Sequence, residues 1–165
     1  MGGALRRTRP DDMAAEAIKG ALARVPAIAP EMVDDVVLGC ATPEAEQGLN
    51  VARIAGLLAG LPARAAAVTV NRFCASGLQA IAMAAGRIVV DGAPAMIAGG
   101  VESISQIRTR SATDAGDSGI DPWIQEHKPA LYMAMIETAD IVAQRYGIGR
   151  EAQDRFSAES QRKTE

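Results

Sequence analysis

The chain has 165 residues, a length that suits one domain of ordinary size or one domain with a small addition. Its 17 basic residues are scattered and its formal net charge is −3, which argues against a nucleic-acid-binding surface. Apolar residues make up 48% of the chain but aromatic residues only 3%, so we expect a core of Ala, Val, Ile and Leu.

Targeting and redox signals are also sparse. No apolar stretch follows a basic N-terminal start, so no signal peptide is predicted. Arg53, Arg64 and Arg87 interrupt the apolar stretches, which predicts no membrane span. Cys40 and Cys74 are far apart and lack the spacing of a zinc site, so we expect free thiols in a reducing cytoplasm and no metal centre.

The first predicted element is an amphipathic helix over residues 10–25. Pro10 suits a first helical turn, and Asp11 and Asp12 suit the positive helix N-terminus. Pro26 ends the helix. Its apolar residues recur at spacings of three and four and predict one buried face: Met13, Ala14, Ala17, Ile18, Ala21, Leu22 and Val25.

A strand is expected over residues 35–39, after a single short turn at Pro30. Residues 42–48 are polar and predict a loop, and Asn50 is the expected N-cap of a helix over residues 50–59. Gly60 ends that helix. Its predicted buried face consists of Val51, Ile54, Ala55, Leu57 and Leu58.

Residues 66–90 are expected to form a strand, a tight turn and a helix. Residues 66–70 are a short apolar run with β-branched residues, as in a buried strand. Residues 78–89 are apolar on nearly every face, which predicts a buried helix. Cys74 lies in the turn between the two elements.

Cys74 has two interpretations at this position. Unpaired N–H groups at a helix N-terminus favour a negative sulfur, which would make the thiol more nucleophilic. A free cysteine is, however, most often a small buried hydrophobic residue. Ligands of parallel sheets bind at the carboxyl ends of the strands, and Cys74 follows such an end, so we favour the nucleophile.

The rest of the chain completes an α/β pattern. Residues 95–98 predict another strand, so helix and strand alternate four times before residue 101, as in a mostly parallel sheet covered by helices. Residues 106–123 are polar and predict an exposed loop, in which Trp123 is interpreted as a packing anchor. Helices are expected over residues 132–146 and 150–163, the second with Phe156 directed inward.

The residues around Cys74 resemble the acyl-enzyme motif of thiolases, which reads V-N-R-F-C-A-S-G-L-Q-A-I here. Other segments resemble thiolase segments in the same order: Gly2-Gly3-Ala4-Leu5, Arg9-Pro10-Asp11-Asp12, Asp34-Asp35-Val36-Val37-Leu38-Gly39-Cys40, Asn50-Val51-Ala52-Arg53 and Ile97-Ala98-Gly99-Gly100-Val101-Glu102-Ser103. The resemblance implies a thiolase-like N-terminal α/β domain with a mostly parallel mixed sheet over residues 1–104. It implies part of a loop subdomain and the start of a helix over residues 105–165, with the family's first strand and C-terminal half absent.

The same resemblance implies the chemistry. It makes Cys74 the nucleophile that carries an acyl thioester, with its backbone N–H as one donor of an oxyanion hole. The reaction would be 3-ketoacyl-CoA thiolysis, as in β-oxidation of fatty acids, or acetyl-CoA condensation. Coenzyme A would be a substrate and no cofactor is expected. Met135 resembles a residue on the acyl and pantetheine path, although simple helix packing is its other interpretation. The full-length protein would form a homodimer or tetramer.

Part of the family's catalytic set does not occur in these residues. Thiolases take an activating His from a Gly-His-Pro setting and a second Cys from a Cys-x-Gly setting, and neither setting is present here. His127 lies in a different context and is interpreted as an exposed loop residue, and Cys40 is expected in the core. We therefore expect the isolated chain to be nearly inactive. The alternative is a non-catalytic thiolase-like module for binding or oligomerisation, while a redox role of Cys74 is disfavoured because no resolving cysteine is nearby.

Overall fold

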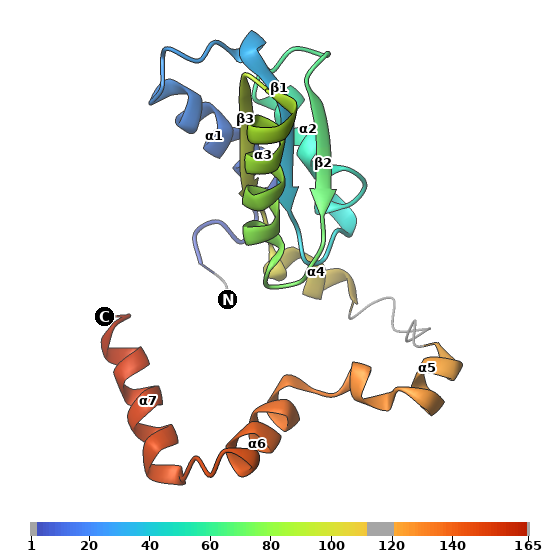
Figure 1. Cartoon of the computed structure of the whole chain (residues 1–165), viewed down its shortest axis with the longest axis vertical. Coiled ribbons are helices and arrows are strands. Elements are labelled where there is room, and N and C mark those ends of the chain that lie inside the picture. Colours follow the sequence, from blue (N-terminus) through green and yellow to red (C-terminus); the bar gives the residue numbers. More distant parts are fainter. Residues whose placement is uncertain (1–2, 112–120, 165) are drawn as a thin grey trace. The chain divides into compact units, whose positions relative to one another are not determined.

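The computed structural model describes residues 3–111 and 121–164, and only the backbone of residues 108–111. The chain divides into two compact units, Met1–Ala115 and Gly116–Glu165. Figure 1 shows the elements of both units, and each unit is treated by itself below.

The first unit is a three-stranded sheet with helices on its faces. Its elements are α1 (Pro10–Ala23), η1 (Pro30–Met32), β1 (Val33–Gly39), η2 (Ala45–Gln47), α2 (Val51–Leu58), β2 (Ala66–Val70), α3 (Ser76–Asp91), β3 (Ala95–Gly100) and α4 (Ile104–Ser111). The strands pair in parallel in the order β2-β1-β3, with Gly39 opposite Val70 on one side and Gly100 on the other. The predicted α/β class is confirmed, and the described strands form a wholly parallel sheet rather than a mixed one.

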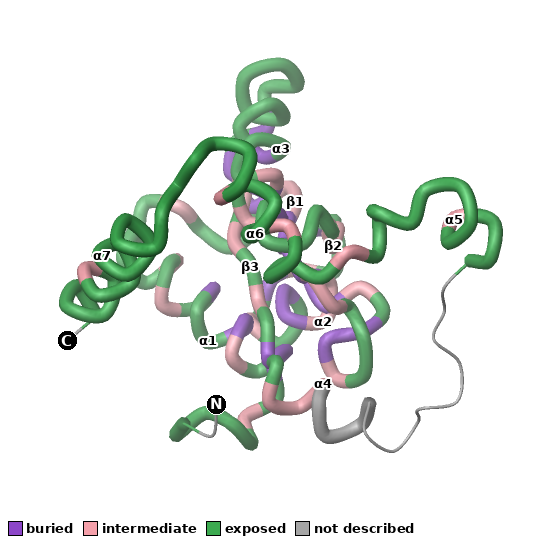
Figure 2. The backbone as a smooth tube through the Cα atoms, turned by 90° about the horizontal axis from the view of Figure 1, so that it is seen from below, coloured by how far each residue is buried: buried purple, intermediate pink, exposed green. Residues whose placement is uncertain are grey.

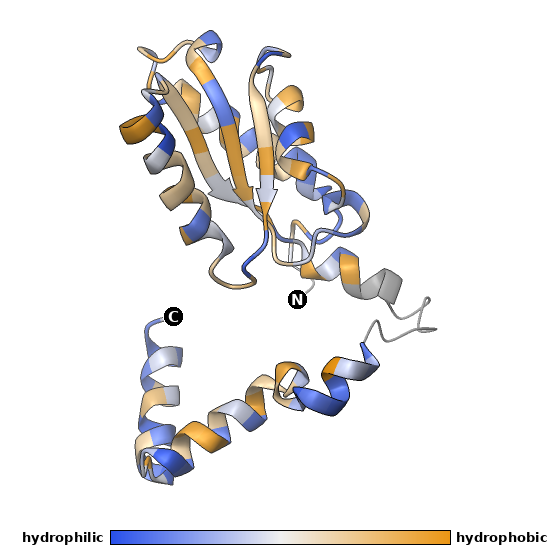
Figure 3. Cartoon of the chain, turned by 45° about the vertical axis from the view of Figure 1, so that its right-hand side comes forward, coloured by the Kyte–Doolittle hydropathy of each residue, from blue (hydrophilic) through white to orange (hydrophobic). Residues whose placement is uncertain are grey.

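The two faces of the sheet carry different helices (Figure 1). Successive residues of a strand point to opposite faces, so Val36 and Leu38 of β1 lie on one side and Val37 on the other. The first side packs against α1 and α2, and the second packs against α3. In Figure 3 much of the length of the three strands has the colours of apolar residues. Because β1 is central and buried on both sides, it holds the unit together.

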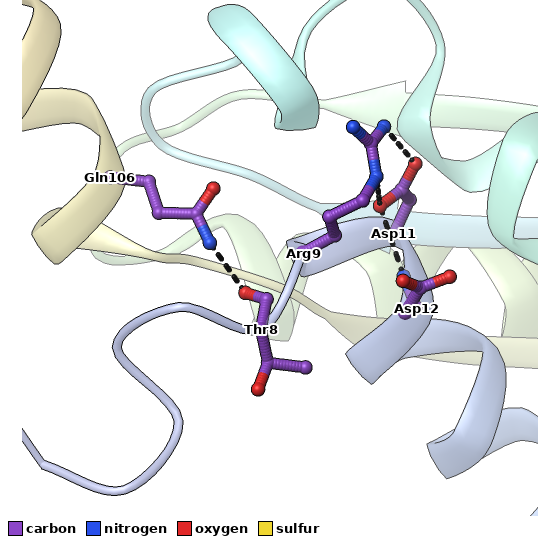
Figure 4. Close-up of polar contacts among 5 residues, drawn as sticks. All are labelled: Thr8, Arg9, Asp11, Asp12 and Gln106. Carbon is purple, nitrogen blue, oxygen red and sulfur yellow. Dashed lines mark hydrogen bonds and ion pairs between the residues drawn. The ribbon is translucent and has the colours of Figure 1, made fainter.

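The start of α1 is fixed by an ion pair that Figure 4 shows in close-up. Arg9 donates from Nε and Nη2 to the Asp11 carboxylate at 3.1 and 2.8 Å, and the Asp11 side chain is almost fully buried. Burial by itself would raise the pKa of Asp11, but the hydrogen bonds and charge of Arg9 outweigh it and hold that pKa below its usual value. Gln106 of α4 donates to the Thr8 carbonyl beside this helix start.

The buried faces of α1 and α2 differ in part from the predicted ones. In α1 the buried residues include Ala14, Ala15 and Ile18, while Ala17 and Ala21 are exposed. In α2 the predicted Leu57 and Leu58 are exposed. The residues that face the sheet in α2 are Val51, Ala52, Ala55 and Gly56. Ala52 and Ala55 belong to the core cluster that includes Val36 and Leu38 of β1, and the two leucines lie on the exposed side of the helix.

The prediction that α3 is buried all round is wrong for the described chain. Its buried residues are Ser76, Ala80 and Ala84, which pack on the sheet. Figure 2 shows that most of α3 is exposed, and Leu78 and Val89 reach 72% and 82% exposure. A helix that is apolar on every face is stable when other protein packs against every face. The described residues of this unit pack against one face only.

The apolar segment that contains α3 is also longer than expected from the sequence. The segment Phe73–Asp91 has 19 residues and is, by length and composition alone, long and apolar enough to cross a membrane. The expectation that every apolar stretch falls short of a span was therefore wrong, because Arg87 lies near one end of the segment. A core helix of a globular protein has the same length and composition.

The described residues of the second unit form helices without a core of their own. They are α5 (Pro122–His127), η3 (Pro129–Tyr132), α6 (Met135–Arg145) and α7 (Arg150–Arg162). None of these helices has a buried residue, and Phe156, predicted to point inward, is 78% exposed. The predicted loop over residues 106–123 is wrong at both ends, which lie in α4 and α5, and residues 112–120 lie outside the described residues.

We expect Asp11→Asn to destabilise the first unit near neutral pH. A hydrogen bond to a charged group contributes about 1.5–3 kcal/mol to stability. Asn has no negative charge and only one side-chain oxygen, so it cannot replace the carboxylate that pairs with Arg9. Because the folded pKa of Asp11 is lowered, its contribution is present above the unfolded pKa and is lost as pH falls through the folded pKa. Urea unfolding at several pH values should show a gap between wild type and variant that closes in acid.

Asp12→Asn is the matched control, since Asp12 is exposed in the same helical turn and also faces the helix dipole. Equal losses of stability for the two variants would show that the dipole, and not the Arg9 pair, matters.

Candidate functional site

Cys74 lies in the turn that joins β2 to α3, after Val70 and two residues before Ser76. Its side chain is exposed. The structure thus places the sulfur at the carboxyl edge of the parallel sheet and next to a helix start, as the sequence predicted. The catalytic role of Cys74 stays a prediction at this point.

Polar side chains build the turn around Cys74. Asn71 Oδ1 accepts the Phe73 N–H at 2.8 Å. Ser76 Oγ accepts the Arg72 N–H at 2.8 Å and donates to the Phe73 carbonyl at 2.6 Å. Phe73 has a positive φ of 49°, a left-handed conformation that costs a non-glycine residue about 1–2 kcal/mol. The hydrogen bonds offset this cost and hold Cys74 at the tip of a defined turn.

The start of α3 leaves backbone donors uncapped. Ala75 is the N-cap and offers no side-chain acceptor to the first turn of the helix. Within the described residues the Cys74 N–H has no hydrogen-bond acceptor either. Free N–H groups at the positive end of a helix stabilise a nearby anion, whether a thiolate or an oxyanion. This part of the turn therefore has N–H groups available to an anionic group beside it.

Gly39, the last residue of β1, sets how close α3 comes to the sheet. A Cβ atom at Gly39 would lie 2.6 Å from the Ser76 carbonyl carbon and 2.7 Å from the Gly77 nitrogen. Both atoms belong to backbone and cannot rotate away. The close approach places the first turn of α3, and Cys74 before it, directly against the end of the central strand.

A second polar group lies at the same edge of the sheet, in the loops after β1 and β3. Gln47 is buried and its amide hydrogen-bonds to the side chain of Glu102 and to the backbone of Thr42 and Ser103. Cys40 is buried beside it, as predicted, and donates its thiol to the Gln47 carbonyl at 4.0 Å. Burial, with a contribution from the Glu102 charge, raises the pKa of Cys40 and keeps it a neutral thiol.

Sequence reasoning missed Gln47, Asn71 and Glu102. Each follows one of the three parallel strands, and that shared position was the available signal, because such residues meet at one edge of the sheet. Across the described residues, no cluster of three or more His, Cys, Asp or Glu side chains is arranged to hold a metal ion.

The remaining predicted residues lie in the second unit. Met135 is the first residue of α6 and is 79% exposed, and its predicted place on a substrate path stays a prediction. His127 is exposed as expected, but it ends α5 rather than lying in a loop. Its ring stacks on Trp123 with centroids 4.5 Å apart, and its Nδ1 lies 2.9 Å from the Trp123 carbonyl. These contacts give both rings a packing role within one helix.

Comparison with known proteins agrees with this arrangement. The family model for the thiolase N-terminal domain matches residues 1–165. The chain belongs to the thiolase family. It is 46% identical over 158 residues to a 3-ketoacyl-CoA thiolase of Bacillus subtilis (strain 168), covering 96% of this chain and 39% of that relative.

Two further thiolase relatives support the assignment. A 3-oxoadipyl-CoA/3-oxo-5,6-dehydrosuberyl-CoA thiolase of Escherichia coli (strain K12) is 41% identical over 175 residues, covering 99% of this chain and 44% of the relative. The crystal structure of the Bacillus anthracis acetyl-CoA acetyltransferase superposes with a TM-score of 0.73 at 33% identity, covering 94% of this chain and 41% of that one. This thiolase chain thus spans about two fifths of the length of its relatives.

We expect Gly39→Ala to displace the start of α3 and to disturb the Cys74 turn. The added methyl group would collide with backbone, and such overpacking costs about 1–3 kcal/mol. Thermal unfolding should show the loss of stability, and alkylation by iodoacetamide should show an altered rate at Cys74.

Gly99→Ala on the neighbouring strand is the control, since a Cβ there would meet the Leu38 side chain at 3.5 Å, an ordinary contact. If Gly39→Ala behaves like Gly99→Ala in both measurements, the close approach does not govern the site.

Proposed function

We propose that this chain is the nucleophile-bearing part of a thiolase, in which Cys74 carries an acyl group taken from an acyl-CoA. The supporting observation is that an exposed Cys74 lies in a hydrogen-bonded turn between the end of β2 and the uncapped start of α3. Relatives named 3-ketoacyl-CoA thiolase and acetyl-CoA acetyltransferase support the substrate class.

In the proposed reaction the Cys74 sulfur, having lost its proton to a base, attacks the 3-keto carbon of a 3-ketoacyl-CoA. The bond between carbons 2 and 3 then breaks, and its electron pair stays on carbon 2, which takes a proton and leaves as acetyl-CoA. The shortened acyl group remains on Cys74 as a thioester. The thiol of a second CoA attacks that thioester and releases Cys74, and the same steps in reverse give condensation.

The described chain supplies the nucleophile and one oxyanion donor, the Cys74 N–H. The base and the acid would come from a part of the complete protein that corresponds to the other three fifths of its relatives' length. We therefore propose that the isolated chain has little turnover. The exposed apolar side of α3 supports the view that further protein covers this helix, either the rest of the polypeptide or a second subunit. Met135 is proposed to line the acyl path in that complete protein.

Alkylation tests the nucleophile directly. We expect iodoacetamide at neutral pH to modify Cys74 several times faster than a model thiol such as N-acetylcysteine amide, because free backbone donors at a helix start stabilise the thiolate. Intact-mass spectrometry followed by peptide mapping would assign the site. Cys74→Ser should abolish the fast modification, and the buried Cys40 provides the internal control.

Acyl transfer needs the complete polypeptide, whose coding sequence beyond Glu165 should contain Gly-His-Pro and Cys-x-Gly motifs. Acetyl-CoA should then leave one acetyl group on Cys74, detectable by mass spectrometry after rapid acid quenching. A downstream sequence without these motifs would favour the non-catalytic module instead. If the isolated chain turned over a 3-ketoacyl-CoA in a reaction that depends on Cys74, this would contradict the proposal that the base and the acid lie outside this chain.

A further inference from the structure

The loops that leave β1 and β3 are joined by side-chain hydrogen bonds between Gln47 and Glu102. Gln47 Nε2 donates to Glu102 Oε1 and, at 2.7 Å, to the Thr42 carbonyl, while Gln47 Oε1 accepts the Ser103 N–H at 2.8 Å. Glu102 Oε2 accepts the Ala41 N–H at 2.7 Å. One amide and one carboxylate thus connect two loops that are more than fifty residues apart in sequence.

A second link continues from the loop after β1 to the Cys74 turn. Asn71 Nδ2 donates to the Ala41 carbonyl at 3.1 Å, and Asn71 Oδ1 accepts the Phe73 N–H at 2.8 Å. Ala41 therefore gives its N–H to Glu102 and its carbonyl to Asn71. Since Phe73 is bonded directly to Cys74, a continuous path of hydrogen bonds runs from Gln47 to the nucleophile.

We propose that Gln47 and Glu102 are positioning residues for Cys74, acting through Ala41 and Asn71. The proposal rests on the proposed function of Cys74, because it concerns the geometry of the same site. Neither side chain hydrogen-bonds to Cys74 within the described residues, so neither is a catalytic residue.

Two features make this pair suited to hold one geometry. Gln47 is 1% exposed, so its amide depends on protein partners, and an arrangement of the loop that left it unpaired would be strongly disfavoured. Glu102 is exposed at its other side, so its charge keeps contact with solvent while its oxygens accept two charge-assisted hydrogen bonds, which are the stronger kind. The pair therefore combines a fixed buried anchor with a carboxylate that orients Ala41.

The test uses the variants Glu102→Gln, Asn71→Ser and the double variant of the whole chain. Glu102→Gln leaves one side-chain oxygen for two donors, the Gln47 amide and the Ala41 N–H. Whichever way the new amide is oriented, its NH₂ faces one of these donors, so the link between Gln47 and Ala41 is broken. Asn71→Ser removes the long amide that reaches Ala41 but keeps a hydroxyl that accepts the Phe73 N–H. Gln47→Met removes the amide but keeps a similar side-chain volume. It therefore removes the hydrogen bond between residues 47 and 102 in a second way.

We expect Glu102→Gln to raise hydrogen exchange of the Ala41 and Phe73 amides and to slow iodoacetamide labelling of Cys74. Loss of one hydrogen bond of typical net strength corresponds to a change of about fivefold to tenfold in these rates. In the Asn71→Ser background the same substitution should no longer change labelling, because the path is already cut, although Ala41 exchange should still rise.

Glu44→Gln is the matched control, since it removes one negative charge from an exposed residue of the loop after β1, the loop that contains Ala41. Equal labelling rates for Glu44→Gln and Glu102→Gln, or additive effects of Glu102→Gln and Asn71→Ser, would overturn the proposal. If Gln47→Met lowers the melting temperature sharply, the exposed Glu102 still provides the decisive comparison. Slow labelling of wild-type Cys74 would instead contradict the proposed function, while amide exchange would continue to report on the path.

Discussion

The structure depends on the close approach of a helix start to the end of the central strand. Gly39 ends β1 between Val70 and Gly100, its partners on the two neighbouring strands, and its missing side chain leaves room for the backbone of Ser76 and Gly77. A bulkier residue would push the first turn of α3 off the sheet. The turn with Cys74 precedes that first turn, so the location of the sulfur follows from backbone packing at one position.

The main course of the fold could be predicted because its signals are local. Pro10, Asn50 and Gly60 mark helix ends, and the structure begins α1 at Pro10, caps α2 with Asn50 and gives Gly60 a positive φ. The bounds of the strand over residues 66–70 were predicted correctly, but its burial was not, because none of its residues is buried in the described chain. The burial of α3 was predicted wrongly. Its apolar composition on all sides indicates that other protein should pack on all sides of it, but the described residues pack on one side only.

The candidate site was predictable to a smaller extent, for a related reason. Cys74 stands out through its place after one strand and before one helix, which are neighbours in sequence. Gln47 and Glu102 meet because β1 lies between β2 and β3, and that strand order is not written in any local pattern. A polar residue after a strand is common, and which of these residues pair depends on register, where Gly39 opposes both Val70 and Gly100.

Among the described residues, the hydrogen bonds that shape the Cys74 turn come from the first unit, namely from Asn71, Ser76 and the loop that Gln47 and Glu102 hold. The described helices of the second unit contribute no buried residue. Proton transfer, in contrast, requires a base and an acid placed against that sulfur. Under the proposed function, the fold of the sheet thus sets the position of Cys74, while turnover depends on the base and the acid that the complete protein supplies.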